Sequence, residues 1–134
     1  MGVGTLILLD THALVWAIEN SKRLSRSAAS AIRRARSQGG IAVSSITTWE
    51  LASMLARGRI RRYGTLESSL ELLLEDVVVL PITTEIAALA AQFPSDYPGD
   101  PADRIIGGTA RAEGLTLVTH DERIRRSPLL RTVW

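Results

Sequence analysis

Two aspartates stand where apolar runs of the sequence end. Asp10 directly follows Leu6–Leu9, and Asp121 lies just beyond Leu115–Thr119. A run that is apolar on successive residues predicts a strand covered on both faces, as in the centre of a parallel sheet. Ligands of open α/β sheets bind at the carboxyl ends of such strands. The two carboxylates are therefore candidates for one shared site.

Two further acids are placed to reach the same edge of the sheet. Glu50 falls in the first turn of a helix predicted over Trp49–Arg57, just after a predicted strand, Ile41–Ser44. Asp103 opens the helix that precedes the Leu115–Thr119 strand. In right-handed βαβ units, strand ends and the neighbouring helix ends face one edge of the sheet. Four carboxylates can therefore share one cleft.

Four carboxylates held together need a cation. Without one, like-charge repulsion would raise their pKa values. The chain has no cysteine and two histidines, which excludes thiolate zinc sites and most imidazole metal centres. A site of oxygen ligands favours magnesium or manganese over zinc. The expected cofactor is Mg²⁺, or Mn²⁺ in its place.

Each acid also has a simple structural explanation. Asp10 could be the N-cap of the helix that follows it, and Asp121 could cap a turn at Glu122–Arg126. Glu50 could be a first-turn carboxylate favoured by the helix dipole. The segment Asp100-Pro101-Ala102-Asp103 combines an N-cap acid, a proline at N1 and an acid at N3. Capping explains each acid singly, but it does not explain why all four fall at one edge.

Strands and helices alternate along the chain. The predicted strands are Leu6–Leu9, Ile41–Ser44, Val77–Leu80, which we expect to be buried, Leu115–Thr119, and an edge strand at Leu130–Val133. Helices are predicted over Thr11–Ile18, Trp49–Arg57 and Leu66–Leu74, and Thr47 or Thr48 begins the second of these. A further helix is capped by Ser25 or Ser27 and ends near Gln38. Two more run from Thr83 or Thr84 to about Gln92 and from Asp100–Asp103 to about Glu113. We expect a three-layer α/β/α sandwich with a mainly parallel sheet, as one domain over residues 1–134. The one long irregular segment is Phe93–Gly99, and such loops are often functional.

The basic residues are unevenly distributed. Arginine supplies fifteen of the sixteen, clustered in Lys22–Arg36, Arg57–Arg62 and Arg123–Arg131. If four of the fourteen acidic residues gather in a pocket, ten remain on the rest of the surface against sixteen basic ones. A basic rim around an acidic pocket suits a polyanion held near a bound metal.

These residues fall into four motifs. They are Leu8-Leu9-Asp10-Thr11-His12, Ser44-Ser45-Ile46-Thr47-Thr48-Trp49-Glu50, Asp100-Pro101-Ala102-Asp103-Arg104-Ile105-Ile106 and Leu117-Val118-Thr119-His120-Asp121. As an ordered set that spans nearly the whole chain, they resemble the motifs of PIN-domain ribonucleases, specifically the VapC-type toxins of type II toxin–antitoxin pairs. The resemblance implies a PIN-like fold and a metal-dependent endoribonuclease that leaves a 5′-phosphate and a 3′-hydroxyl.

The resemblance also implies roles for single residues. Asp10, Glu50, Asp103 and Asp121 would form the catalytic site. Asp10 and Asp103 would hold the metal, with Asp121 or Glu50 bound directly or through water, and Glu50 would position the attacking water. Thr119 would be a supporting hydroxyl, while Asp100 is either a ligand or only a helix cap.

The resemblance implies three partners: an RNA substrate, a small cognate antitoxin and a second copy of the chain. The early helices carry more apolar side chains than one small core needs, among them Trp16, Trp49 and Leu55. This excess also favours a homodimer. The tryptophans, including Trp134, are better explained by packing or interfaces than by base stacking. His12 is better explained as a helix residue near the pocket than as a ligand.

Other functions fit less well. A response-regulator receiver needs an aspartate at the end of its third strand and a late lysine, whereas here the third strand ends in Leu80-Pro81 and the one lysine is Lys22. A non-catalytic RNA-binding PIN-like module is the serious alternative, but it should have lost one or more of the four acids. No run is long enough to span a membrane and no targeting signal is visible, so we expect a cytoplasmic protein.

Overall fold

A computed structural model describes residues 6–134 of the chain. Its centre is a five-stranded sheet in the order β3-β2-β1-β4-β5, and every neighbouring pair is parallel. The strands are β1 (Ile7–Leu9), β2 (Ile41–Ser44), β3 (Val77–Leu80), β4 (Leu117–Val118) and β5 (Thr132–Val133). The first strand therefore lies in the middle of the sheet, as its uninterrupted apolar run predicted.

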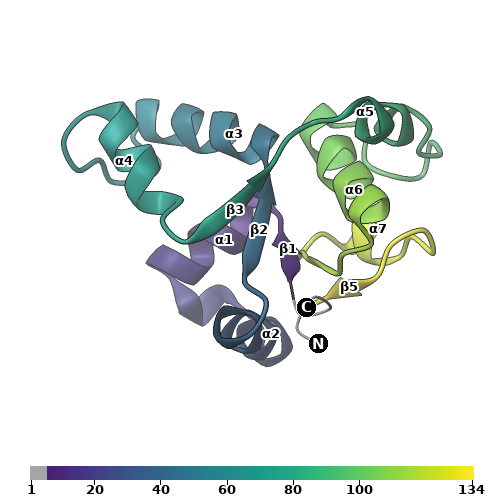
Figure 1. Cartoon of the computed structure of the whole chain (residues 1–134), viewed down its shortest axis with the longest axis horizontal. Coiled ribbons are helices and arrows are strands. Elements are labelled where there is room, and N and C mark those ends of the chain that lie inside the picture. The colour runs from purple at the N-terminus through teal and green to yellow at the C-terminus, as the bar shows by residue number, and fades with distance from the viewer. Residues whose placement is uncertain (1–5) are drawn as a thin grey trace.

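Helices lie on both sides of this sheet (Figure 1). They are α1 (Thr11–Glu19), a 3₁₀ turn η2 (Ser21–Arg23), α2 (Arg26–Ser37), α3 (Ser45–Ala56), α4 (Leu66–Leu73), α5 (Thr84–Ala91), α6 (Pro101–Glu113) and α7 (Glu122–Arg125). Helices α1 to α4 cover one face, while α5, α6 and α7 lie on the other. The three-layer α/β/α sandwich with a parallel sheet is confirmed.

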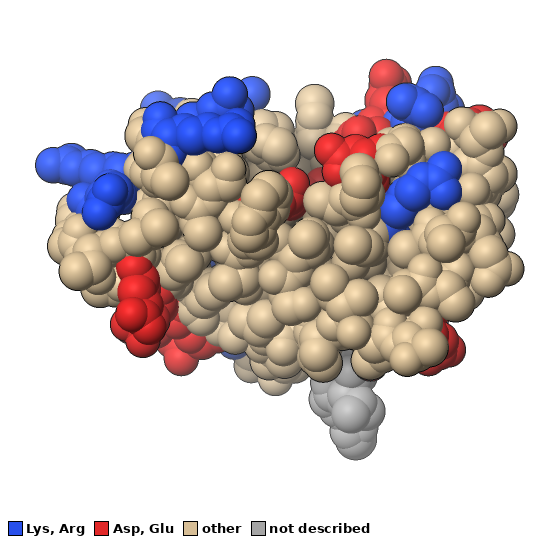
Figure 2. All heavy atoms as spheres, turned by 90° about the horizontal axis from the view of Figure 1, so that it is seen from above, with Lys and Arg blue, Asp and Glu red and all other residues tan. Residues whose placement is uncertain are grey.

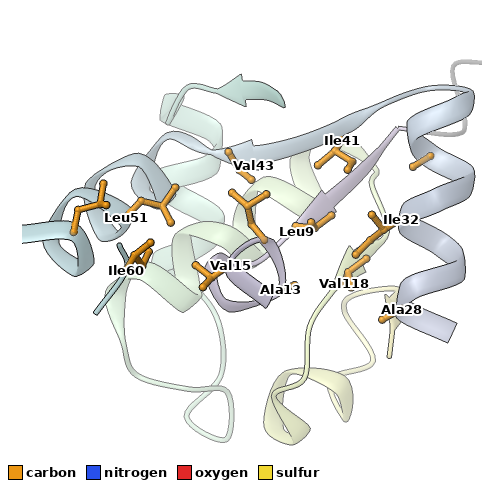
Figure 3. Close-up of a cluster of buried hydrophobic side chains, with 13 residues drawn as sticks. Leu9, Ala13, Val15, Ala28, Ile32, Ile41, Val43, Leu51, Ile60 and Val118 are labelled. Carbon is orange, nitrogen blue, oxygen red and sulfur yellow. The ribbon is translucent and has the colours of Figure 1, made fainter. Parts of the chain in front are cut away.

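Alternate strand residues feed two separate apolar clusters. Leu9 and Val118 pack with α1, α2 and α3 in one cluster (Figure 3), whereas Leu8 and Leu117 pack with α6 and α7 in the other. Successive side chains of a strand point to opposite faces, so a strand between two helix layers must be apolar at every position. This double burial fixes the ends of β1 and β4, where the acids begin.

The helix starts follow their capping side chains. Ser25 rather than Ser27 caps α2, accepting a bond from the Ala28 amide at 3.0 Å. Ser44 caps α3, so this helix begins earlier than Thr47 or Thr48. The prediction that Glu50 lies in the first turn was wrong, because Ser44 supplies the cap one turn upstream. Helix-dipole stabilisation therefore no longer explains Glu50.

The third strand is less buried than its sequence suggested. Val78 and Val79 are 47% and 39% exposed, because β3 is an edge strand with helices covering little of its outer part. The expectation of a buried strand at Val77–Leu80 was wrong.

Of the residues expected at a homodimer interface, Leu55 is only 1% exposed and so cannot contribute to one, whereas Trp49 is 66% exposed.

Two adjacent glycines let α5 and the following loop lie close to α6. A Cβ on Gly108 would lie 2.8 Å from the Ile86 carbonyl oxygen. A Cβ on Gly107 would collide with the ring of Tyr97, which stacks on Phe93 with centroids 3.9 Å apart. Gly-Gly packing thus sets the position of the loop before Asp100.

No helix within residues 6–134 combines the length and apolarity that crossing a bilayer requires.

Candidate active site

The acids predicted from the sequence line one cavity of about 340 Å³ at the carboxyl edge of the sheet. Its lining residues are Asp10, Thr11, His12, Trp16, Glu50, Asp100, Asp103, Ile106, His120 and Asp121. They come from the ends of β1 and β4 and from α1, α3 and α6. Seen from above, acidic side chains lie in and beside a hollow, with basic side chains farther out on both sides (Figure 2).

Asp10 is fixed between two strands and a helix. Its backbone amide bonds the Val118 carbonyl of β4 at 3.1 Å, and its Oδ1 caps α1 by accepting from the Ala13 amide at 2.8 Å. Burial raises the pKa of this carboxyl, while hydrogen bonding from the Thr119 side chain and the Ala13 amide lowers it in part. Thr119 is itself fully buried and accepts a bond from the Asp121 amide at 3.1 Å. One hydroxyl thus links two of the acids.

The pKa of Asp103 is strongly raised. Its pKa rises to about 7, first because the carboxyl is partly buried and then because Asp100, Asp121, Asp10 and Glu50 repel its negative charge. Burial raises the pKa of Tyr97, and the charges of Asp103, Asp121 and Asp10 raise it further. The Tyr97 hydroxyl donates to the Asp103 carbonyl oxygen at 3.2 Å. Because four other carboxylates raise the pKa of Asp103, these acids lie close enough for their charges to interact.

Capping and site lining occur in the same residues. The Oδ1 atom of Asp100 accepts from the Ala102 amide at 2.7 Å, and the Oδ1 atom of Asp121 accepts from the Arg123 amide at 2.8 Å. Asp10 also caps through its Oδ1 atom. These caps use a single oxygen of each carboxylate, so capping by itself leaves the other oxygen for a ligand. The structural explanation of these acids therefore does not compete with the functional one.

Two threonines for which the sequence predicted no role in the site form a hydrogen-bonded chain to Glu50. The Thr11 hydroxyl donates to Glu50 Oε1 and lies 3.0 Å from the Thr47 hydroxyl. Both threonines are buried. Thr11 follows Asp10 directly, and Thr47 lies three residues before Glu50 on the same helix face. The available signal was a threonine close to each acid within its motif.

The donor set suits a hard divalent cation. The acids supply carboxylate oxygens, and Thr11 adds a neutral hydroxyl to the lining. Within residues 6–134, no three of the Asp, Glu or His side chains already gather closely enough to ligate one ion. A bound cation would offset the repulsion between the acids that raises the pKa of Asp103.

Comparisons with known proteins agree with the geometry. The sequence model of the PIN domain matches residues 7–128. The chain is 42% identical over 132 residues to Ribonuclease VapC22 of Mycobacterium tuberculosis, covering 97% of this chain and 99% of that protein.

Two solved structures have the same fold. Rickettsia felis VapBC2, bound to a promoter DNA fragment, aligns with a TM-score of 0.72 and 21% identity over 95% of this chain and 96% of that one. DNA-bound VapBC of Salmonella typhimurium aligns with a TM-score of 0.69 and 25% identity over 94% and 95% of the two chains.

Proposed function

This chain belongs to the PIN-domain family, and we propose that it is a metal-dependent endoribonuclease that acts as the toxin of a type II toxin–antitoxin pair. The observation that carries the proposal is the cavity shared by Asp10, Glu50, Asp103 and Asp121. In this cavity the other acids raise the pKa of Asp103. The ribonuclease VapC22, to which it is 42% identical, supports RNA as the substrate. A toxin of this kind would act in the cytoplasm, where its RNA substrate is.

We assign the cation to Asp10, Asp103 and Asp121, with Mg²⁺ or Mn²⁺ as the ion. Bound there, it would neutralise charge on the phosphate and acidify a water molecule. Asp100 keeps its role as the cap of α6, and its second oxygen is available to the same site. Thr119 supports the site by orienting Asp10 and the turn that carries Asp121.

Glu50 would orient the attacking water and accept its proton. Its Oε1 accepts from the Thr11 hydroxyl, which fixes the carboxylate toward the cavity and leaves Oε2 for the water. The P–O3′ bond would break as the water oxygen bonds to phosphorus, and the leaving 3′ oxygen would take a proton from solvent to give the 3′-hydroxyl. The protonated Glu50 would release its proton to solvent. Thr11 is a positioning residue in this scheme.

The arginine clusters would hold the RNA backbone on either side of the acidic hollow (Figure 2). Arginine supplies most of the positively charged side chains, and its planar guanidinium pairs well with phosphate oxygens. Contacts of this kind position the backbone without reading its sequence. Base contacts would then select the cleavage site.

An antitoxin segment would occupy an apolar groove between α1 and α4. Ile18, Tyr63 and Leu72 line it, and they are 45%, 56% and 56% exposed. An amphipathic helix can bury such a row and bring a basic side chain to the acidic cavity. Leu72→Asp should prevent a co-expressed antitoxin from co-purifying and inhibiting while RNA cleavage by the free protein continues. Retained inhibition would remove this groove from the proposal.

Trp49 supports the homodimer, since it is the most exposed of the large apolar side chains in residues 6–134. Trp49→Lys should convert the dimer to a monomer in light scattering at micromolar concentrations. A wild-type monomer under the same conditions would end the dimer proposal.

The deciding experiment is cleavage of structured and single-stranded RNA by the purified protein. We expect cleavage with magnesium or manganese, none with EDTA, and a loss of at least a hundredfold with Asp103→Asn, in line with the removal of a charged group from a catalytic site (about 3 kcal/mol). Asp96→Asn is the matched control, because Asp96 is exposed in the loop before α6 and does not line the cavity. RNA binding without cleavage by any preparation would favour the non-catalytic module instead.

A further inference from the structure

Part of the cavity wall is aromatic. His12 and Trp16 come from α1, and His120 comes from the segment after β4. All three line the same cavity as the carboxylates. They add little to metal binding by oxygen ligands, so the proposed chemistry leaves this wall without a role.

The rings of this wall form a connected network. Trp16 lies at the centre, with its centroid 5.9 Å from that of His12 and 5.7 Å from that of His120. Trp134, at the end of the chain, lies 5.8 Å from Trp16 and 5.0 Å from His120. The contacts are tilted or edge-on, with interplanar angles of 50° to 72°. Such contacts are favourable and hold each ring in a fixed orientation.

Fixed orientation is combined here with exposure. His12 and His120 are exposed and Trp16 is half-buried, although all three adjoin a cavity. No parallel ring covers either imidazole in the described chain, in contrast to the closely stacked Phe93 and Tyr97 of the core. Rigid, solvent-facing rings are the usual platform for an unpaired base, because every base has a π face.

A cation stands beside the same wall. The Arg23 guanidinium lies 4.3 Å from the Trp16 ring centroid, as in a cation–π contact. Arg23 is exposed at the end of η2 and can also meet a phosphate. Acids and rings that line one cavity, with an arginine beside Trp16, match the three parts of a nucleotide unit: the reacting phosphate, the base and the next phosphate.

We propose that His12, Trp16 and His120 form a stacking subsite for one unpaired nucleobase next to the phosphate that is cleaved. This inference rests on the proposed ribonuclease function and adds to it the part of the site that would hold a base. In a duplex both faces of each base are covered by neighbours, so a base must be unstacked to reach such rings. Packing alone explains the Trp16–Trp134 contact, which ties β5 to α1, but it does not explain two exposed imidazoles on the cavity side.

The test compares octamers of adenylate, cytidylate and uridylate with versions that carry one abasic ribose at each position in turn. Binding is measured by fluorescence anisotropy with magnesium in Asp103→Asn protein, and cleavage of the same octamers is measured with wild-type protein. At one position next to the cleaved bond, loss of the base should weaken binding by about five- to 150-fold, the range for loss of one stacked base. His120→Ala should weaken binding of intact octamers by a similar factor and leave the octamer lacking that base unaffected.

Ile82→Ala is the control, because Ile82 is an exposed apolar side chain that does not line the cavity. His120→Ala removes an exposed side chain, and its melting temperature checks that the fold is intact. Equal losses for intact and abasic octamers would overturn the subsite. Failure of all three octamers to bind or be cleaved would also overturn it if total RNA is still cleaved, whereas loss of cleavage of total RNA as well would overturn the proposed function.

Discussion

Replacing Asp103 with asparagine should stabilise the protein in the absence of metal. The pKa of this carboxyl rises from 3.8 to about 7 through burial and repulsion by the neighbouring acids. The folded protein therefore holds a proton that the unfolded chain releases, and the free energy of unfolding falls as the pH rises from about 4 to 7. Asparagine keeps the shape of the side chain and carries no charge to be desolvated or repelled.

The magnitude follows from the shift. About three pKa units at ~1.4 kcal/mol each give an upper bound of ~4 kcal/mol. Solvent screening of this partly exposed carboxyl reduces that to about 2 kcal/mol. Loss of an acid from the first turn of α6 costs about 0.3–1 kcal/mol through the helix dipole. The net gain is about 1–2 kcal/mol at pH 7.5, or roughly 3–8 °C in melting temperature for a chain of this length.

The assay is thermal unfolding followed by circular dichroism in EDTA at pH 5 and pH 7.5. The advantage of Asp103→Asn should be larger at pH 7.5, and Asp96→Asn should melt with the wild type at both values. Magnesium at a hundredfold excess over its dissociation constant should stabilise the wild type by about 2.7 kcal/mol and the variant much less. A variant that melts below the wild type in EDTA at both pH values, with equal shifts on adding magnesium, would refute the electrostatic reasoning and leave Asp103 as a structural residue of the helix.

Three further changes have defined outcomes. Thr11→Val removes the hydroxyl that holds Glu50, so kcat for RNA cleavage should fall about 10- to 100-fold with KM little changed; steady-state kinetics checks this, and an equal effect on KM would mean a role in binding. Gly108→Ala puts a Cβ 2.8 Å from the Ile86 carbonyl, which should cost about 1–3 kcal/mol in urea unfolding, while Gly99→Ala, with nothing within 4 Å, should be nearly neutral. RNA affinity should fall steeply with salt, with a log–log slope of about −0.7 per phosphate contact, and a flat salt dependence would argue against the arginine rim.

Local signals in the sequence were enough for the strands, the helices and the acids. Branched apolar runs can be buried only between two layers, so the first strand and the central parallel sheet followed from residue types alone. The cap of α6 followed from Asp100 and Pro101, since these residues act within one turn. The gathering of the acids into one cavity also followed, because chain direction places the ends of parallel strands at the same edge.

Only the tertiary structure decided properties that depend on distant neighbours. Val77–Leu80 has the composition of a central strand, yet it lies at the edge because strand order is set by long-range pairing. The bond from Thr11 to Glu50 joins residues 39 positions apart, and no local pattern encodes it. The pKa of Asp103 depends on burial and on acids from three other elements, which act together only once the sheet has brought them there. Short-range chemistry thus placed each acid on its own element, and the folded sheet turned four separate carboxylates into one electrostatic site.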